Sequence, residues 1–275
     1  MDYRNININA YKQVENAENY KTTKELEEYR SKRLNDVLPA TEFLEKSIYK
    51  GVPLRVLEYC SGSSCLLYSL EKRGLLKEGF GVEISENRFG FAERWKNDHG
   101  FTKVKNLNLN VEELDFPEDS FDLIILVDSA FCYFFPENFE LPEKVVSQIG
   151  KWLVKDGKCI FDMMTRVKDR EICNEQGSHS YWLEFEAENP FRYGLYKQEI
   201  IDPENSIIFT QNIYIRRDGF IDDSKKEFTR FYTLDEISKM LERHDMNTVD
   251  YFSDFEENIY SEGSSERLVC IGEKI

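Results

Sequence analysis

Positive charge is scarce in this chain of 275 residues. It has 36 Lys and Arg against 52 Asp and Glu, which leaves a formal net charge of −16. A protein that tracks an extended nucleic acid needs a cationic surface that displaces counterions from the phosphates. The composition therefore argues against nucleic acid as a partner and favours cationic small molecules, peptides or a positively charged cofactor as ligands.

Paired cysteines are also missing. The six cysteines include no C-x-x-C pair and are spread over the whole sequence: Cys60, Cys65, Cys132, Cys159, Cys173 and Cys270. A disulfide framework or a zinc ribbon needs closer spacing than this. We therefore expect reduced thiols, as in a cytoplasmic protein, and no metal site.

Long apolar segments are absent as well. The longest one, residues 121–135, is interrupted by Asp122 and Asp128, and it is shorter than the roughly 20 apolar residues of a membrane helix. The first twenty residues have neither the cationic start nor the apolar centre of a secretory signal. Hydrophobic residues still make up 41% of the chain, enough for a large core. We expect a cytoplasmic protein with no membrane partner.

Short apolar runs alternate with helical patterns over the first 165 residues. The residues 24–50 have helical spacing, and Pro39 divides them into two helices. Gly157 is expected to end a later amphipathic helix that contains Trp152. The predicted strands are residues 54–60, 80–84, 104–109, 121–127 and 158–164. Such alternation is typical of an α/β fold with a mostly parallel sheet that helices cover on both faces.

Residues 166–232 have a different pattern. Strand-like runs rich in aromatics are separated by turn sequences at residues 202–205 and 218–219, which predicts an inserted antiparallel β ribbon. Thr233 and Glu236 then form a capping-box pattern for a helix, and two last strands near 248–252 and 267–272 close the sheet. The predicted units are a helical segment, 1–50, a main domain, 51–165 and 233–275, and the insertion, 166–232.

The loop after the first strand, residues 58–64, is the usual ligand cradle of an open parallel sheet. It contains one glycine, Gly62, whereas a dinucleotide site needs G-x-G-x-x-G so that backbone amides approach a pyrophosphate. A cofactor without a pyrophosphate tolerates fewer glycines. At the tip of the second strand, Glu83 can accept two hydrogen bonds from the hydroxyls of a ribose; the alternative is a solvated acid at a strand end.

Three segments in order resemble the class I S-adenosylmethionine-dependent methyltransferases. VLEYCSGSS is similar to their glycine-rich first motif, GVEIS to their second, and NVEELDFPEDSFDLIILVDS to the segment that precedes their fourth strand. The late segment FYTLDEISKMLERHDMNTVDYF is similar to their last helix and strand. The resemblance implies a seven-stranded, mostly parallel Rossmann-like sheet and S-adenosylmethionine as the cofactor. It also implies that residues 1–50 form a lid and residues 166–232 a hood over the substrate.

The resemblance assigns five residues to the methionine and ribose parts of the cofactor. Glu58 would lie beneath the methionine amino group, and Cys60 and Gly62 would line the loop against the methionine and the ribose. Glu83 would bind the ribose. Asp128, at the end of the fourth strand, would face the methionine end and the methyl group.

The adenine would contact three further residues. Ile84 would pack on one face of the ring, Asn110 corresponds to the aspartate that binds the adenine amino group, and the amide of Val111 would meet the ring. The sequence departs from the family pattern because Cys60 and Ser64 replace the first and third motif glycines and Asn110 replaces the aspartate.

No catalytic constellation is evident, so the catalytic residues are not assigned. In-line methyl transfer from a sulfonium is downhill and depends mainly on positioning. Candidates for substrate contact are Tyr20, as part of an aromatic lid, Tyr133, just beyond the fourth strand, and His179, at the start of the ribbon. A surface position is the favoured explanation for His179, core packing is at least as good an explanation for Tyr133, and packing is an alternative for Tyr20. The basic cluster at residues 30–33 is expected to be a solvated face.

The favoured hypothesis is a methyltransferase that acts on an N or O atom of a small molecule. Two alternatives stay open. The first is a methyltransferase that acts on RNA or protein, for which the charge offers no basic track. The second is a catalytically silent module that binds the cofactor or a partner, for which Cys60 and Ser64 are the only support. About half of the ribbon's aromatic residues are expected to pack in a core, and for the rest the alternatives are a roof over a substrate cavity and a contact between two copies of the chain.

Overall fold

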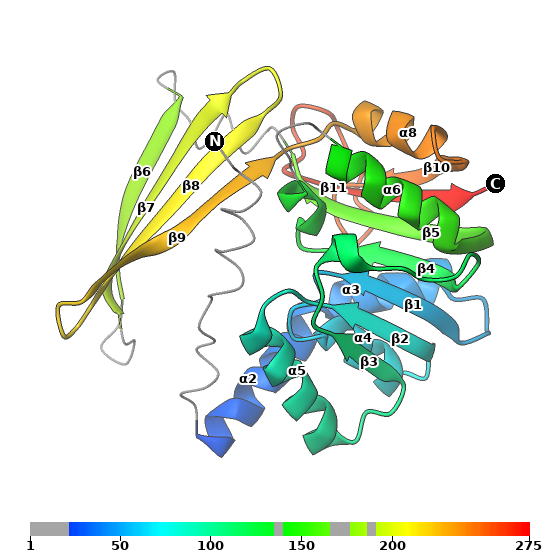
Figure 1. Ribbon diagram of the computed structural model, residues 1–275, viewed down its shortest axis with the longest axis horizontal. Helices are drawn as coiled ribbons and strands as arrows, with labels where there is room; N and C mark the ends of the chain where they lie inside the picture. Colours follow the sequence, from blue (N-terminus) through cyan, green and yellow to red (C-terminus); the bar gives the residue numbers. More distant parts are fainter. Residues whose placement is uncertain (1–21, 135–139, 166–176, 186–190) are drawn as a thin grey trace.

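The main unit of the computed structural model is a seven-stranded sheet with the order β10-β11-β5-β4-β1-β2-β3 (Figure 1). The structure describes residues 22–134, 140–165, 177–185 and 191–275. The strands are β1 (Leu54–Tyr59), β2 (Leu76–Val82), β3 (Val104–Leu107), β4 (Phe121–Leu126), β5 (Leu153–Met164), β10 (Met246–Phe252) and β11 (Arg267–Lys274). The first five are parallel to one another, and β11 is antiparallel to β5 and β10. The predicted α/β class and the seven-stranded, mostly parallel sheet are confirmed.

Helices cover both faces of this sheet (Figure 1). One face packs against residues of α3 (Leu38–Phe43), the π-helix η2 (Leu44–Ile48), α4 (Cys65–Lys72) and α5 (Glu86–His99). The other packs against α6 (Glu140–Trp152) and α8 (Leu234–Glu242). The helix α2 (Thr23–Asp36) precedes α3, and its break from α3 beside Pro39 was predicted. Two short 3₁₀ helices, η3 (Val111–Glu113) and η4 (Ala130–Tyr133), follow β3 and β4.

The end of α6 differs from the prediction. The helix ends at Trp152 and β5 begins at Leu153, so Gly157 does not end the helix but lies inside the strand. Asp156 has a φ of 62°, and a Cβ at Gly157 would lie 2.8 Å from the carbonyl oxygen of Val154. The backbone is therefore tightly bent here. Gly157 lies at an irregularity within the strand, where a side chain would collide with the backbone.

The predicted insertion forms a second, antiparallel sheet with the order β6-β7-β8-β9. Its strands are β6 (Ser178–Glu184), β7 (Phe191–Asp202), β8 (Ile207–Arg216) and β9 (Ile221–Arg230). Figure 1 shows this sheet beside the edge at which the parallel strands of the main sheet end. We refer to it as the hood sheet. None of the described helices is long and apolar enough to cross a membrane.

Candidate functional site

The loop after β1 repeats one unusual backbone conformation at every second residue. Cys60, Gly62 and Ser64 have φ angles of 52°, 56° and 57°. This left-handed region is accessible to glycine at little cost, whereas a residue with a Cβ is strained there. These are the three positions at which the methyltransferase motif carries glycine. The chain thus has, at all three motif positions, the backbone conformation that suits glycine, although two of the glycines are replaced.

Space for the Ser64 side chain comes from the neighbouring strand. A Cβ at Gly81 of β2 would lie 2.6 Å from the Ser64 Oγ and 2.8 Å from the Ser61 Oγ. The Ser64 hydroxyl donates a hydrogen bond of 2.7 Å to the Oδ1 of Asn106 on β3. The loop can therefore pack closely on the sheet because β2 has a glycine, Gly81, at the point where the hydroxyls of Ser61 and Ser64 lie.

Glu83 directly follows β2 and binds the same loop. Its Oε2 accepts a hydrogen bond from the Gly62 amide at 3.0 Å, and its Oε1 accepts one from the Ser85 amide at 2.7 Å. The side chain is buried, and this burial raises the pKa of the carboxyl group despite the amide donors. Each oxygen retains a lone pair for a hydroxyl donor.

Glu58, the fifth residue of β1, is a buried acid with an unsatisfied oxygen. Only 3% of the residue is exposed, and its Oε2 has no hydrogen-bond partner among the described residues. Burial raises the pKa of Glu58 to about 8; the charge of Arg33 opposes this rise and that of Glu83 adds to it. A ligand that donates N–H bonds to this oxygen would remove a desolvation cost that the fold otherwise carries.

Asp128 lies at the end of β4 with an exposed side chain. Its amide donates a hydrogen bond of 2.8 Å to the Oδ2 of Asp162. Asp162 is buried and is held by Arg267, whose Nε and Nη2 lie 3.0 and 2.6 Å from its oxygens. This bidentate pair fixes the backbone at Asp128, and it leaves the Asp128 carboxylate directed away from the core.

The adenine candidates lie after β2 and β3. Asn110 caps η3: its side chain accepts a hydrogen bond of 3.2 Å from the Glu112 amide. Val111 is buried and Ile84 is half-buried. Asn108 joins the two segments, because its Nδ2 donates to the carbonyl oxygens of Glu83 and Ile84 at 2.8 and 3.2 Å. The structure thus positions both segments at the carboxyl end of the sheet.

The three substrate candidates are not brought together in the part of the chain that the structure describes. Tyr20 lies outside the described residues. Tyr133 is half-buried in η4, which contacts β9 of the hood sheet. His179 is exposed on β6, which β7 and β8 separate from β9, and its ring lies 5.6 Å from that of Tyr181.

The basic cluster 30–33 is not simply a solvated face, and that prediction is wrong for Arg30. Its side chain is 2% exposed, and it pairs with Glu27 at 2.6 Å and with Asp98 of α5 at 2.7 Å. The guanidinium also lies over the rings of Phe91 and Trp95. Arg30 therefore joins α2 to α5.

Arg33, one turn later, was not singled out from the sequence, but its charge reaches the candidate site. Burial disfavours its charge, but nearby negative groups, Asp36 and Asp128 among them, raise its pKa. Its charge also acts on Glu58. Arg30 and Arg33 are three residues apart on one helical face, but nothing in the sequence indicates that the charge of Arg33 acts on Glu58 and Asp128.

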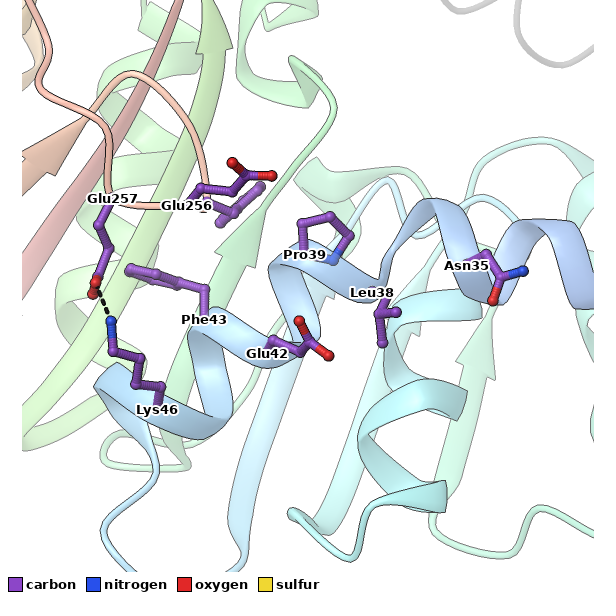
Figure 2. A pocket seen from close by; sticks show the side chains of 9 residues that line it. Asn35, Leu38, Pro39, Glu42, Phe43, Lys46, Glu256 and Glu257 are labelled. Atoms are coloured by element: carbon purple, nitrogen blue, oxygen red, sulfur yellow. Dashed lines mark hydrogen bonds and ion pairs between the residues drawn. The ribbon is translucent and has the colours of Figure 1, made fainter.

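A separate cavity of about 350 Å³ lies between the helices α2 and α3 and the loop that joins β10 to β11 (Figure 2). Phe43 and Pro39 line it from the helical side, and Lys46 forms an ion pair with Glu257 across it. None of the candidate cofactor residues lines this cavity. No cluster of three or more metal-ligating side chains occurs among the described residues.

Comparisons with known proteins were made with family models and with solved structures. The model of a family described as methyltransferase domain matches residues 51–213. The solved structure of the CcbJ methyltransferase from Streptomyces caelestis is similar, with a TM-score of 0.73 at 18% identity; the match covers 86% of this chain and 94% of that one. A S-adenosylmethionine-dependent methyltransferase from Clostridium acetobutylicum gives a TM-score of 0.71 at 16% identity, over 90% and 98% of the two chains.

A third similar structure is that of CalS10 from Micromonospora echinaspora, an amino pentose methyltransferase with S-adenosylmethionine bound. Its TM-score is 0.62 at 11% identity, and the match covers 96% of this chain and 100% of that one. No curated protein sequence matches the chain significantly. At these identities the three structures show the fold alone. The family model shows the kind of domain, a methyltransferase domain.

Proposed function

We propose, from the premise that this chain belongs to the methyltransferase domain family, that it transfers a methyl group from S-adenosylmethionine to an N or O atom of a small molecule. The chain is thus a class I methyltransferase, an enzyme whose cofactor supplies an electrophilic methyl group on a sulfonium sulfur. The observation that carries the site assignment is the buried Oε2 of Glu58, which has no hydrogen-bond partner among the described residues and precedes a loop with three left-handed residues.

The donor set of this chain fits the two charged groups of the methionine end. Glu58 can accept N–H bonds from the ammonium group, and this ligand cation would stabilise the ionised carboxylate. Arg33 is the nearby cation that can pair with the carboxylate of the ligand. Because the pKa of Glu58 is raised to about 8, binding of the ligand ammonium at neutral pH would be coupled to release of the Glu58 proton.

The rest of the nucleoside would be held by the strand ends. Glu83, whose oxygens already receive the Gly62 and Ser85 amides, can also accept the two ribose hydroxyls. Ile84 can cover the adenine while the Val111 amide and Asn110 meet its edge. Cys60 can line the loop, since its side chain is exposed although the surrounding protein raises the pKa of its thiol.

The chain's own contribution to transfer would be positional. Asp128, exposed at the end of β4, would face the methyl-bearing end. The hood sheet beside this edge would exclude water and hold the acceptor in line. The proposed division of the chain is a lid, 1–50, a cofactor domain, 51–165 and 233–275, and a hood, 166–232.

A small-molecule acceptor is favoured over RNA by the formal charge of −16, because RNA binding requires a cationic surface. The similar structures include an amino pentose methyltransferase, which supports a small acceptor. A contact between two chains through the hood sheet remains an alternative use of its exposed aromatic residues, Tyr181 and Trp182 among them.

The test is the binding of S-adenosylmethionine by isothermal titration calorimetry. Glu83→Ala should weaken binding by about 1–3 kcal/mol, or about 5- to 150-fold, because the ribose hydroxyls lose a charged acceptor. Glu78→Ala is the matched control: Glu78 belongs to β2 and pairs with Lys105 at 2.6 Å, away from the loop. Absence of cofactor binding to the unmodified protein would refute the proposed function.

A further inference from the structure

The backbone at the end of β4 has a conformation that residues with side chains rarely adopt. Asp128 and Ser129 have φ angles of 54° and 62°, so two consecutive residues lie in the left-handed region. Such residues are strained and keep this conformation only where the surrounding contacts impose it. The contacts of this segment therefore determine where the Asp128 carboxylate is directed.

Three hydrogen bonds attach the segment to β5. The regular pairing of β4 with β5 ends before Asp128. Beyond it, the Asp128 amide donates to the Oδ2 of Asp162 at 2.8 Å, and the Ser129 amide donates to the carbonyl oxygen of Asp162 at 2.9 Å. The Ser129 Oγ accepts a hydrogen bond of 3.1 Å from the Met164 amide. Asp162 thus binds both left-handed residues, one through its side chain and the other through its backbone.

Arg267 fixes the orientation of the Asp162 carboxylate. Its Nε and Nη2 donate to the Oδ1 and Oδ2 of Asp162 at 3.0 and 2.6 Å. A planar guanidinium that binds both oxygens prevents the carboxylate from rotating, so the Oδ2 stays directed at the Asp128 amide. Asp162 is 2% exposed, whereas the Arg267 side chain is 39% exposed. The buried acid is therefore held from the ligand edge of the sheet, where β11 begins beside the end of β5.

Asp128 supplies the net charge that this group of three residues presents at the ligand edge. Asp162 and Arg267 are in contact and have opposite charges, so their fields largely cancel at a distance. Burial opposes the charge of Arg267, but Asp162 and, less strongly, Asp128 raise its pKa. The Asp128 carboxylate therefore lies within electrostatic reach of the pair, and its own side chain is exposed.

We propose that Asp162 and Arg267 are positioning residues that hold the Asp128 carboxylate against the sulfonium group of S-adenosylmethionine. This inference rests on the proposed function, in which Asp128 faces the methyl-bearing end. The carboxylate attracts the positively charged sulfonium, whereas the thioether of S-adenosylhomocysteine is neutral and is not attracted. The three residues thus strengthen binding of the cofactor relative to its product.

The first experiment measures the affinity of the full chain for S-adenosylmethionine and for S-adenosylhomocysteine by calorimetry. Asp128→Asn should weaken S-adenosylmethionine binding about three- to tenfold, because the sulfonium loses its counter-charge, and should change the affinity for S-adenosylhomocysteine by less than about twofold. Asp162→Ala should give the same pattern. Equal losses of affinity for the two nucleosides in Asp162→Ala would indicate a merely structural role and would overturn the proposal.

A double variant shows whether Asp162 acts through Asp128. In the Asp128→Asn background the charge is already absent, so adding Asp162→Ala should weaken S-adenosylmethionine binding no further. Losses that add in the double variant would contradict the proposed relation. Higher ionic strength should also weaken S-adenosylmethionine binding more in the unmodified protein than in Asp128→Asn.

A conservative change keeps the proposal testable if Asp162→Ala does not fold. Arg267→Lys retains the positive charge but not the two-pronged contact with the carboxylate. It should weaken S-adenosylmethionine binding about twofold or more relative to S-adenosylhomocysteine, and an unchanged ratio of the two affinities would overturn the proposal. Thermal unfolding establishes that each variant is folded at the temperature of the titration.

A matched control exists on the same two strands. Lys158 of β5 and Glu273 of β11 form an ion pair toward the other end of both strands. Lys158→Met combined with Glu273→Gln removes this pair and should leave the ratio of the two affinities unchanged. The same change of ratio as in Asp162→Ala would mean that any break between β5 and β11 has this effect, and it would refute a positioning role for Asp162.

The inference and the proposed function fail in different ways. If the unmodified protein binds both nucleosides, and neither Asp128→Asn nor Asp162→Ala changes the ratio of their affinities, the positioning role is wrong and the proposed function stands. If the unmodified protein binds neither nucleoside, the proposed function itself fails.

Discussion

At the scale of single residues, burial of Glu58 carries a desolvation cost. Its carboxyl group is buried, one oxygen has no partner among the described residues, and its pKa is raised to about 8. The sequence identified this acid through the motif but gave no information on its protonation, because that depends on burial and on Arg33, which is 25 positions earlier in the chain.

Glu58 predicts a pH dependence of stability. Between the ordinary carboxyl pKa of 4.5 and the folded value of about 8, the unfolded chain has lost the Glu58 proton while the folded protein retains it. The free energy of unfolding therefore falls as pH rises through this window, by up to about 4 kcal/mol. Urea unfolding of the unmodified protein and of Glu58→Gln at pH 5 to 8 should show a slope that the variant lacks. Parallel profiles would contradict the assignment.

Arg33 predicts a loss of affinity without a loss of fold. Arg33→Met should weaken S-adenosylmethionine binding about tenfold, because the ligand carboxylate loses a charge-assisted hydrogen bond. Lys32→Met is the control, since Lys32 is exposed on the same helix and should leave the affinity within twofold. Equal effects of both substitutions on calorimetric affinity would mean that only the overall charge matters.

At the scale of elements, the loop after β1 and the strand β2 are adapted to each other. Gly81→Ala should destabilise the fold by about 1–3 kcal/mol, because its Cβ would overlap the hydroxyls of Ser61 and Ser64. Adding Ser64→Gly should recover part of this loss by removing one of the two contacts. Urea unfolding of the single and double variants measures this coupling; strictly additive effects would show that the two positions do not interact.

The attachment of α2 to α5 is a second relation between elements. Arg30→Met should destabilise the protein by about 1–2 kcal/mol, less than a fully buried pair would, because Glu27 and Asp98 are about half exposed. Hydrogen exchange should show faster opening in α2. Lys24→Met, which removes only an exposed i,i+4 pair with Glu28, should leave exchange unchanged, and the same exchange rates in both variants would exclude an anchoring role for Arg30.

The sequence predicted most elements because strand and helix periods, the break beside Pro39 and the capping box at Thr233 are local signals. It failed at Gly157, where the same residue type suits a helix end or a tight place in a strand. It failed at Arg30 because pairing with α5 is a long-range contact. It could not predict that Gly81 accommodates Ser64, since the two residues meet only when β2 lies beside β1.

At the scale of the whole molecule, the proposed cofactor site lies at the strand ends of the main sheet, and the proposed acceptor site lies on the hood sheet that faces it. The hood sheet stands beside the edge at which β1, β2 and β4 end (Figure 1). A single reaction centre between the two sheets would place the cofactor against the buried acids Glu58 and Glu83 of the main sheet.

The most direct test of this central claim is a crystal structure of the protein with S-adenosylhomocysteine. The ribose hydroxyls should lie within hydrogen-bond distance of Glu83, and the ligand ammonium should contact the Oε2 of Glu58. The Cys60 thiol should leave the ligand position open. A nucleoside bound elsewhere, or a loop in which the Cys60 thiol fills the position of the ligand, would contradict it.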